Sequence, residues 1–595
     1  MSAIAGLWRL DGSGAEAGCR AMLEAQRAYG ADARDHWPGG DIAIGRNLAR
    51  LLPEDRFDAQ PAVGGGGRFV LVADVRIDNR AEIGAAIGLE DERLARWSDS
   101  ALLLAAWERW EEGCLGHLVG DYAFGLWDSE RRCLFLARDF AGSRPLHFHG
   151  AARLFAFASM PKGLHALPEI ERAPDLAFAA NAIEGRSPPA SGSWFAGIET
   201  VRPGHLVTVS AAGAVQRRWW RPDPETIRLP GPEDYAEGLR DQLDRAVRSR
   251  LRGRESVAAH LSAGLDSAAV ATSAAQLLAP AGRVVAFTAV ARAGYCETRS
   301  PPLLDEGPPA AATAALWPNI EHVILPAAGP LPLDRIAEYC DLSDQPLPNL
   351  CNLHWSMAIA DAARSRGLDV LLTGQYGNFA FSYDGLFLLP DLLRRGRLPA
   401  LVRQSAALWR GGFARPRNLA GILARSFLAG GWAPPGERGQ RLRPFEVNDL
   451  GRLLKGELAR SGLDCRDPTA DRRLVEFCLA VPPEEFLRGG IPRSLARRAL
   501  AGRVPEAVLA ERRKGVQAPD WHEPAAAQLG DLRAALSASA GAPAAGLLPL
   551  DRLHAMLDSW PDADWSRPAV SRDYRSRLLR PLSLAYFLDG ANGKR

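Results

Sequence analysis

Short apolar runs separated by turns dominate the first third of the chain. Two of them, at 68–78 (RFVLVADVRID) and 121–128 (DYAFGLWD), are rich in β-branched and aromatic residues, which favour strands. Similar runs follow at 132–139, 153–159 and 205–215. Polar or glycine-containing stretches such as 63–67 (VGGGG) separate the runs and are typical of turns. The pattern predicts an α+β domain with antiparallel strands over residues 1–220.

The pattern changes after residues 221–234, which carry four prolines and several charges and have the composition of a linker. Residues 235–251 then repeat apolar positions with the helical period. Beyond them, runs typical of buried strands alternate with helical stretches; these runs are 256–262 (SVAAHLS), 284–290 (VVAFTAV), 322–326 (HVILP) and 369–374 (DVLLTG). Such alternation predicts a doubly wound parallel sheet in an α/β domain over residues 235–595.

Two later segments of this half have a helical pattern. Residues 390–445 are rich in arginine and leucine with glycine breaks, and we expect a helical insertion there. Residues 446–595 are expected to be mostly helical. Two interpretations of the arginines in the insertion stay open: they hold an acidic peptide, or they form a solvated helical face.

Composition narrows the class of protein. A chain of 595 residues is too long for one core, so two or more domains are expected. The formal net charge is only +2, which argues against nucleic acid or a membrane surface as the main partner. Eight scattered cysteines without a CxxC pair fit a reducing compartment. With no signal peptide and no apolar stretch long enough for a membrane span, we expect a cytoplasmic protein.

Residues 261–267 (LSAGLDS) join a predicted strand to a predicted helix at the carboxyl edge of the sheet, where ligands bind in open α/β folds. Backbone N–H groups at the helix start form an anion site, and Ser262 and Ser267 can add hydroxyl donors. Asp266 would repel a phosphate unless Mg²⁺ bridges the two. The alternative is an ordinary turn with a polar helix cap. The GxSxG pattern of a serine nucleophile and the GxxxxGK[ST] phosphate loop are both excluded.

These residues carry a resemblance to a known family. LSAGLDS is similar to the SGGxDS pyrophosphate loop of the asparagine synthetase family, which has the ATP-pyrophosphatase fold. The segments 284–290, 371–378 (LLTGQYGN) and 465–515 resemble further parts of that domain. Residues 118–148 resemble the glutaminase domain of the same family, an antiparallel sandwich of the Ntn-hydrolase type. The resemblance covers most of the chain outside the 390–445 insertion.

The resemblance implies ATP and Mg²⁺ as cofactors and assigns roles to particular residues. The residues that it places at ATP or pyrophosphate are Leu261, Ser262, Ala263, Gly264, Leu265, Asp266, Ser267, Thr288, Ala289, Thr373, Gly374 and Gln375. It places Asp266 and Asn378 at the metal. Lys514, in the segment RRKG, matches the active-site lysine of the family, and its retention among only four lysines in 72 basic residues supports a specific role. The other internal lysines, Lys162 and Lys455, are expected to be solvated.

Two departures from the family pattern change the expected reaction. Where glutamine-dependent members have a cysteine nucleophile after the initiator methionine, this chain has Ser2, and their NGE segment is replaced by residues 74–76 (DVR). We therefore expect a glutaminase-like domain without glutaminase activity. In the second domain, Gln375 stands where a glutamate or tyrosine occurs in relatives, and Asn378 replaces a metal-binding aspartate. A smaller departure is Ala263, where glycine is usual.

The identity of the general base stays open. Asp384 is the candidate that we place at the catalytic centre. The sequence offers further candidates, which are Tyr383, Asp344, His354, Asp305 and Glu306. The last two could instead cap the following helix.

The combination GQYGNFAFSYDG with a non-glutaminase first domain resembles the lasso peptide macrolactam synthetases. This predicts an ATP-dependent, AMP-forming ligase that adenylates an Asp or Glu side chain of a precursor peptide and joins it to the peptide's N-terminal amine, with a leader peptidase as partner. Two alternatives remain: a small-molecule ligase, either β-lactam-synthetase-like or an ammonia-dependent asparagine synthetase, and a non-catalytic scaffold.

Overall fold

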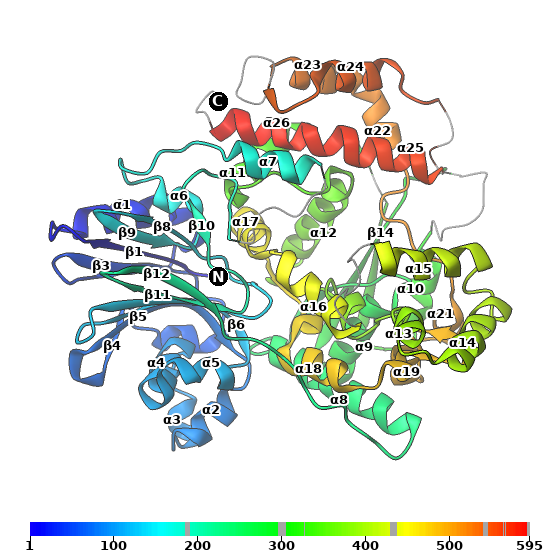
Figure 1. The fold of residues 1–595 in the computed structure, drawn as a ribbon, viewed down its shortest axis with the longest axis horizontal. Coiled ribbons are helices and arrows are strands. Elements are labelled where there is room, and N and C mark those ends of the chain that lie inside the picture. Colours follow the sequence, from blue (N-terminus) through cyan, green and yellow to red (C-terminus); the bar gives the residue numbers. More distant parts are fainter. Residues whose placement is uncertain are drawn as a thin grey trace.

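The computed structural model describes residues 1–184, 191–295, 305–326, 328–428, 437–538, 546–562, 565 and 567–591. It consists of an N-terminal two-sheet domain and a C-terminal α/β domain (Figure 1). No described helix is long and apolar enough to cross a membrane.

The first domain is a sandwich of two antiparallel sheets. One sheet has the order β10 (Glu199–Thr200), β8 (His147–Ala151), β9 (Leu154–Ala158), β1 (Ala3–Arg9), β3 (Ile42–Leu48) and β2 (Ala33–Pro38). The other has the order β12 (Gly213–Arg218), β11 (His205–Ser210), β7 (Cys133–Arg138), β6 (Gly120–Asp128), β5 (Phe69–Ile77) and β4 (Ala62–Gly64). The strands predicted from the apolar runs are confirmed. Side chains such as Ile4, Val72 and Phe157 fill the space between the sheets because alternate residues of each strand face inward.

Short helices cover the outer faces of the sandwich. They are α1 (Glu16–Ala25), α2 (Arg80–Ala86), α3 (Asp91–Leu94), α4 (Asp99–Trp110), α5 (Cys114–His117), α6 (Pro161–Leu164) and α7 (Leu176–Ile183). The longest, α4, begins where Ser98 caps it by accepting a hydrogen bond from the N–H of Ala101, and it buries Leu103 and Trp107 against the second sheet.

The second domain is built on a parallel sheet, as predicted. Its order is β15 (Ile320–Pro326), β14 (Arg283–Val290), β13 (Ser256–His260), β16 (Val370–Leu372) and β17 (Asp464–Arg466). In the register of the central strands, Ala258 lies opposite Val285 on one side and Leu371 on the other. The helices that flank the sheet are α8 (Pro232–Arg250), α9 (Leu265–Leu278), α10 (Gly307–Ala314), α11 (Ile336–Ser343) and α12 (Leu353–Ser365).

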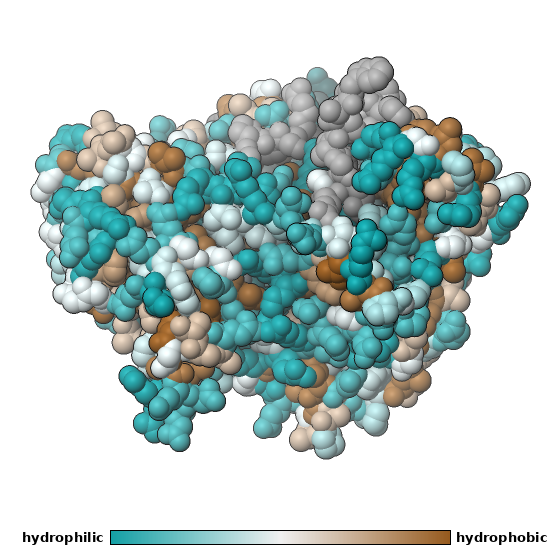
Figure 2. All heavy atoms as spheres, turned by 60° about the horizontal axis from the view of Figure 1, so that its bottom comes forward, coloured by the Kyte–Doolittle hydropathy of each residue, from teal (hydrophilic) through white to brown (hydrophobic). Residues whose placement is uncertain are grey.

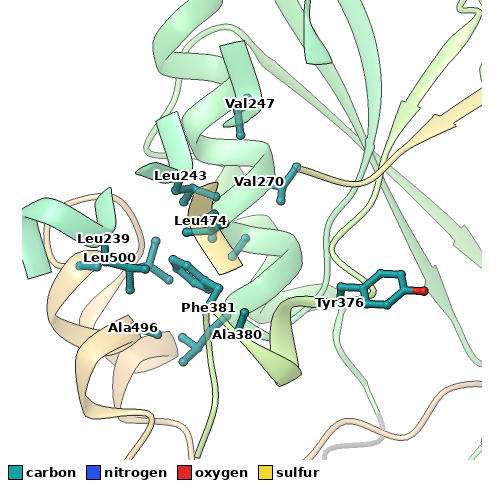
Figure 3. Close-up of a cluster of buried hydrophobic side chains, with 14 of the residues drawn as sticks. Leu239, Leu243, Val247, Val270, Tyr376, Ala380, Phe381, Leu474, Ala496 and Leu500 are labelled. Carbon is teal, nitrogen blue, oxygen red and sulfur yellow. The ribbon is translucent and has the colours of Figure 1, made fainter. Parts of the chain in front are cut away.

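Both faces of this sheet are buried. Val257 and Ala259 of β13 belong to the core that contains α8 and α9, whereas Ala258, between them, belongs to the core that contains α12. Figure 3 shows the first of these cores, with Leu239 of α8 and Phe381 among its members. Because successive side chains of a strand point to opposite faces, an uninterrupted apolar run is needed when helices cover both.

Helices form the described remainder of the second domain. Between β16 and β17 lie α13 (Leu388–Arg394), α14 (Leu398–Arg410), α15 (Pro416–Leu428), α16 (Glu437–Val447) and α17 (Gly451–Ser461). After β17 come α18 (Arg472–Ala480), α19 (Pro483–Phe486), α20 (Ser494–Ala499), α21 (Glu506–Ala510), α22 (His522–Ala527), α23 (Leu529–Ala538), α24 (Leu550–Asp558), α25 (Pro568–Arg572) and α26 (Leu579–Ala591), with the short hairpin β18 (Leu487–Arg488) and β19 (Ile491–Pro492) among them.

Buried ion pairs join the two domains. Arg250, at the end of α8, contacts Asp78 and Asp121 of the first domain and Asp471 of the second, and its side chain is only 1% exposed. Arg76 pairs with the same two carboxylates: its Nη2 lies 2.7 Å from Oδ2 of Asp121, and its Nε lies 3.1 Å from Oδ1 of Asp78. Each of these charges depends on the others, because a single charge left unpaired at such a place is costly.

We expect Arg250→Ala to lower the free energy of unfolding by about 3–5 kcal/mol, because it leaves buried carboxylates without a partner. Arg245→Ala is the matched control on the same helix: Arg245 pairs with Glu82, and both side chains are about half exposed. That loss should stay below about 1 kcal/mol. Chemical denaturation followed by circular dichroism measures both, and equal losses would contradict the role given to the buried network.

Candidate active site

A cavity of about 840 Å³ opens at the carboxyl edge of the parallel sheet. Strands β13, β14 and β16 all point their ends into it, so the loops that follow them supply its floor. Of the residues predicted from the sequence, the cavity brings together Leu261, Ser262, Ala263, Gly264, Leu265, Asp266, Ser267, Thr288, Ala289, Gly374, Gln375, Asn378 and Lys514. Thr373 and Asp384 are not part of its lining.

The loop after β13 is shaped by its two serines. The hydroxyls of Ser262 and Ser267 lie 2.7 Å apart, and the N–H of Ser262 donates to Oγ of Ser267 at 3.0 Å. The N–H of Gly264 donates to Oγ of Ser262 at 3.1 Å. The serines therefore bond to each other and to the loop itself. The free N–H groups for an anion are those of the first turn of α9, which begins at Leu265.

Asp266 lies at the centre of the floor with one oxygen uncommitted. Its Oδ1 is buried and has no hydrogen-bond partner among the described residues. Burial raises the pKa of Asp266 to about 6. Gly377 packs so closely that a Cβ there would lie 2.2 Å from Oδ1. A buried carboxylate oxygen without a partner fits a Mg²⁺ ion that is shared with phosphate oxygens.

The donor set for a metal is small. No group of three or more His, Cys, Asp or Glu that could hold a metal occurs in the described part of the chain. Asn378, the second predicted ligand, accepts a hydrogen bond on Oδ1 from Nη2 of Arg493 at 3.0 Å. A Mg²⁺ ion at Asp266 would therefore depend on phosphate and water oxygens for most of its ligands.

Cationic side chains form one wall of the cavity. Lys514 lines this wall together with Arg513, Arg497 and Arg493. Arg493 has a φ of +59°, in the left-handed region, immediately before α20, and it lowers the pKa of Asp266 against the effect of burial. We did not single out Arg493 and Arg497 from the sequence. Their spacing of four residues places both on one helix face, but so many arginines occur in this chain that the spacing alone was not distinctive.

Glu306 connects the cationic wall to the loop. It precedes α10, and the nearby N–H of Ala263 lowers the pKa of its carboxyl, against the larger effect of burial. It also packs against Gly515, where a Cβ would lie 2.2 Å from Oε1. Any larger residue at 515 would therefore force the Glu306 carboxylate to shift. Burial raises the pKa of Glu306, so this carboxyl takes up a proton more readily than an ordinary glutamate.

The other candidate bases lie outside the cavity lining. Oδ1 of Asp384 accepts from the N–H of Leu386 at 2.9 Å and caps a turn. The ring of Tyr383 packs under the guanidinium of Arg441.

Three further candidates also have structural partners. Asp344 is buried and accepts from the backbone N–H of Lys162 at 2.9 Å, at the interface with the first domain. Nε2 of His354 accepts from the N–H of Ala328 at 3.1 Å. Asp305 accepts from the N–H of Gly307 at the start of α10, which is the capping alternative that we considered. These contacts leave Glu306 as the candidate base that lines the cavity.

Strand β14 is tied to the loop by Thr288. Its hydroxyl donates to the carbonyl of Leu261 at 2.7 Å and lies 2.8 Å from Nε2 of His322. Thr373 is buried, and its N–H donates to the carbonyl of Arg466 in β17. Thr373 lines a separate space of about 20 Å³. Gln375 lines both this space and the main cavity.

A further part of the cavity lining comes from α12, the turn before it and the C-terminal region. Asn352, Trp355 and Ile359 belong to it, and Nδ2 of Asn352 donates to Oε1 of Gln517. Arg575 anchors this part by donating to the carbonyls of residues 517 and 518. The cavity lining therefore combines many charged residues with amide and aromatic side chains.

Comparison with known families identifies both domains. The model described as asparagine synthase matches residues 238–588, more than half of the chain, and the model described as glutamine amidotransferase domain matches residues 1–220. The chain belongs to the asparagine synthase family. The predicted fold class, an antiparallel amidotransferase-type domain followed by a parallel-sheet domain with helices, is confirmed. The family makes the protein an ATP-dependent amide ligase.

Individual relatives are distant. Asparagine synthetase (glutamine-hydrolyzing) 3 of Bacillus subtilis is 25% identical over 524 residues, which cover 84% of each chain. A putative asparagine synthetase of Mycobacterium bovis is 24% identical over 630 residues, covering 94% of this chain and 92% of that protein. The amidase chry2 of Gibberella zeae is 26% identical over 380 residues, which cover 60% of this chain and 54% of that protein.

The amidotransferase domain of this family member has almost no free space beside Ser2. The cavity there measures about 20 Å³, and a single water molecule already needs roughly 10–15 Å³. Asp74 accepts from the N–H of Ser2 at 3.0 Å and from Nζ of Lys455 at 2.7 Å. Lys455 also donates to the carbonyl of Ser2.

The expectation that Lys455 is solvated was wrong. Lys455 projects from α17 of the second domain into the first and is fully buried, with 0% exposure. Burial lowers the pKa of Lys455, and the contact with Asp74 opposes that shift. The sequence could not show this because Lys455 and Asp74 lie 381 residues apart.

We expect Asp266→Asn to weaken the binding of ATP in the presence of Mg²⁺ at least tenfold, because it removes the carboxylate that would hold the cation. Without Mg²⁺, ATP should bind the variant as well as, or better than, the wild type, because a repulsive charge is gone. Asp384→Asn is the control, since that residue lies outside the cavity lining. Isothermal titration calorimetry measures the affinity of the wild type and of both variants for ATP, with and without Mg²⁺. A loss in Asp384→Asn equal to that in Asp266→Asn would return Asp384 to the site.

Proposed function

We propose that the protein closes a macrolactam in a peptide: it adenylates the side-chain carboxyl of an Asp or Glu and joins it to the N-terminal amine of the same peptide. The observation that carries the proposal is the closed space beside Ser2. With Met1 and Ser2 in its lining, a space of about 20 Å³ is too small for glutamine, which supports another source for the amine of the new amide. An amine carried by the substrate removes the need for a glutaminase.

The size and charge of the main cavity support the same reaction. Ligand pockets typically measure about 300–1,000 Å³, and about 840 Å³ accommodates a nucleotide together with part of a peptide. The cationic wall near Asp266 suits the phosphates. The part of the lining with Asn352, Trp355 and Gln517 suits a peptide segment through hydrogen bonds and apolar contact.

The chemistry proceeds in two steps. The substrate carboxylate attacks the α-phosphorus of ATP and pyrophosphate leaves, which gives an acyl-adenylate. The amine then attacks the activated carbonyl, loses a proton, and AMP leaves as the amide forms. Mg²⁺, when bound, neutralises phosphate charge beside Asp266. Lys514 and Arg493 stabilise the negative charge that develops on the leaving groups.

We also propose that Glu306 accepts the proton of the attacking amine. Glu511, another carboxylate of the lining, is held by Arg513, and the pKa of Glu511 falls to about 2. No described basic side chain forms an ion pair with Glu306. A carboxylate with a raised pKa beside the loop is a stronger base than an ordinary glutamate.

The proposal includes a cytoplasmic location and a leader peptidase that releases the N-terminal amine. A second candidate function is an asparagine synthetase that uses ammonia, because two of the relatives are named asparagine synthetases, both of them glutamine-hydrolyzing. A non-catalytic scaffold is disfavoured, because Asp266 and Lys514 are both present in one cavity.

The decisive experiment supplies MgATP with a library of synthetic peptides that have a free amine and one internal Asp or Glu. We expect loss of one water from at least one peptide, with one AMP formed per ring, by mass spectrometry. The same peptide with an acetylated N-terminus should not react. Asparagine formed from aspartate and ammonium, without peptide dehydration, would establish the small-molecule ligase instead. The absence of AMP with every acid would favour the scaffold.

We expect Glu306→Gln to slow amide formation by about 10²–10⁴-fold while ATP–pyrophosphate exchange continues, because only the second step needs the base. Wild-type activity should fall as the pH falls through the raised pKa of Glu306, since the base is lost on protonation, and the variant should lack this limb. Hydroxylamine is already unprotonated at neutral pH and does not need the base before it attacks. With hydroxylamine, the variant should therefore form the hydroxamate from the adenylate. Unchanged amide formation in the variant would exclude Glu306.

A further inference from the structure

Helix α14 carries an apolar stripe on its exposed side. Leu398, Val402 and Trp409 are 53%, 66% and 59% exposed. With 3.6 residues per turn, their side chains fall within about 40° of one another around the helix axis. The neighbouring face of the same helix is already packed, since Leu401 and Leu408 belong to the core that α14 shares with α13 and α15. The stripe is therefore apolar surface that the fold of the insertion does not use.

The segment that carries the stripe is strongly basic, although Glu484 lies 4.0 Å from Arg397. Residues 385–424 contain seven arginines and a single acidic residue, Asp391, which pairs with Arg395 at 2.8 Å. All seven arginines are exposed; they are Arg394, Arg395, Arg397, Arg403, Arg410, Arg415 and Arg417. On the right of Figure 2, the side on which Figure 1 places α13, α14 and α15, brown apolar atoms lie among teal polar atoms. A net charge of +2 for the whole chain makes this local excess distinctive.

Helix α14 contacts two segments that continue into the cavity lining. At the end of α14, the carbonyl of Gly411 accepts a hydrogen bond from Arg512, whose guanidinium also stacks on Phe413. Arg512 is followed directly by Arg513 and Lys514, which line the cavity. On the packed side of α14, the N–H of Gly490 donates to Oε1 of Gln404 at 3.2 Å, three residues before the cavity-lining Arg493.

Single exposed apolar residues are normal on protein surfaces and need no partner. Three exposed apolar residues on one stripe, surrounded by exposed arginines and close to a ligand cavity, need an explanation. A second copy of the chain does not supply it, because it would bring the same positive charge. Charge complementarity favours an acidic partner with an apolar face.

We propose that the α14 stripe, Leu398, Val402 and Trp409 with the flanking arginines, docks an acidic amphipathic segment of the peptide substrate that lies outside the cavity. The source of the partner rests on the proposed function. Apolar side chains of the segment cover the stripe, and its carboxylates pair with Arg403 and Arg410 on the adjoining face. Docking raises the effective concentration of the reacting part of the peptide at the cavity without taking part in the chemistry.

The first experiment tests docking without turnover. The probe is a fluorescein-labelled synthetic amphipathic helix of leucine and glutamate, with a leucine and lysine helix as its charge-reversed control. We expect the acidic probe to bind the wild type in fluorescence anisotropy, more weakly at high salt, and the basic probe not to bind. Val402→Asn with Trp409→Ala, or Arg403→Glu with Arg410→Glu, should weaken binding at least tenfold. Val215→Asn, at an apolar residue of β12 that is 67% exposed, is the matched control and should bind normally.

The second experiment tests whether the docked segment belongs to the substrate. With a peptide that the wild type cyclises, extended by the acidic segment, the stripe variants should raise KM about tenfold and leave kcat unchanged. The same peptide without the segment should react equally with all variants, and the affinity for MgATP should not change.

The outcomes separate the two proposals. No binding of the acidic probe, or equal binding by the stripe variants, would overturn the docking site. Binding that depends on the stripe, together with unchanged KM for the extended peptide, would overturn the assignment to the substrate and leave a protein partner. If the wild type cyclises no peptide but binds the probe through the stripe, the proposed function fails while the docking site stands.

Discussion

The burial of the central sheet on both faces is the constraint on which the rest of this molecule depends. Strand β13 sends Val257 and Ala259 into one core and Ala258 into another, so neither face can hold a ligand. The carboxyl edge is then the place where backbone N–H groups, loop hydroxyls and a helix N-terminus remain available. Asp266 and the cationic wall meet there because the chain returns to this edge after β13, β14 and β16.

The electrostatics of the cavity follow from incomplete neutralisation. Asp266 retains a buried oxygen that has no hydrogen-bond partner among the described residues, while Arg493, Arg497, Arg513 and Lys514 line the same cavity. Such an arrangement is unfavourable for the empty protein and is balanced when phosphates and a cation bind. Glu306 lies beside Ala263 of the loop and packs against Gly515. One carboxylate therefore lies between the loop and the segment that carries Lys514.

The first domain retains its fold while its own pocket is closed. Lys455 of the second domain and Asp74 of the first hold Ser2 between them, and Arg250 joins both domains through buried carboxylates. Buried charges that each need a partner in the other domain fix the relative position of the two halves. In this member of the asparagine synthase family, these contacts pack the amidotransferase-type domain against the parallel-sheet domain.

Much of the fold was predictable from local patterns. The strands of both domains follow apolar runs, because a strand buried on two faces must be apolar throughout, and LSAGLDS marks the loop by its composition alone. The sequence also determined that Gln375 and Asn378 depart from the usual residues. What it left open were contacts between residues far apart in the chain. Only the tertiary structure could decide that Lys455 is buried against Asp74, that Asp384 caps a turn outside the cavity lining, and that Glu306 and Arg493 line the same cavity as Asp266. The physical reason is that a local pattern reports which residues are apolar and how a helix or strand repeats, whereas the partner of a buried charge is chosen by long-range packing.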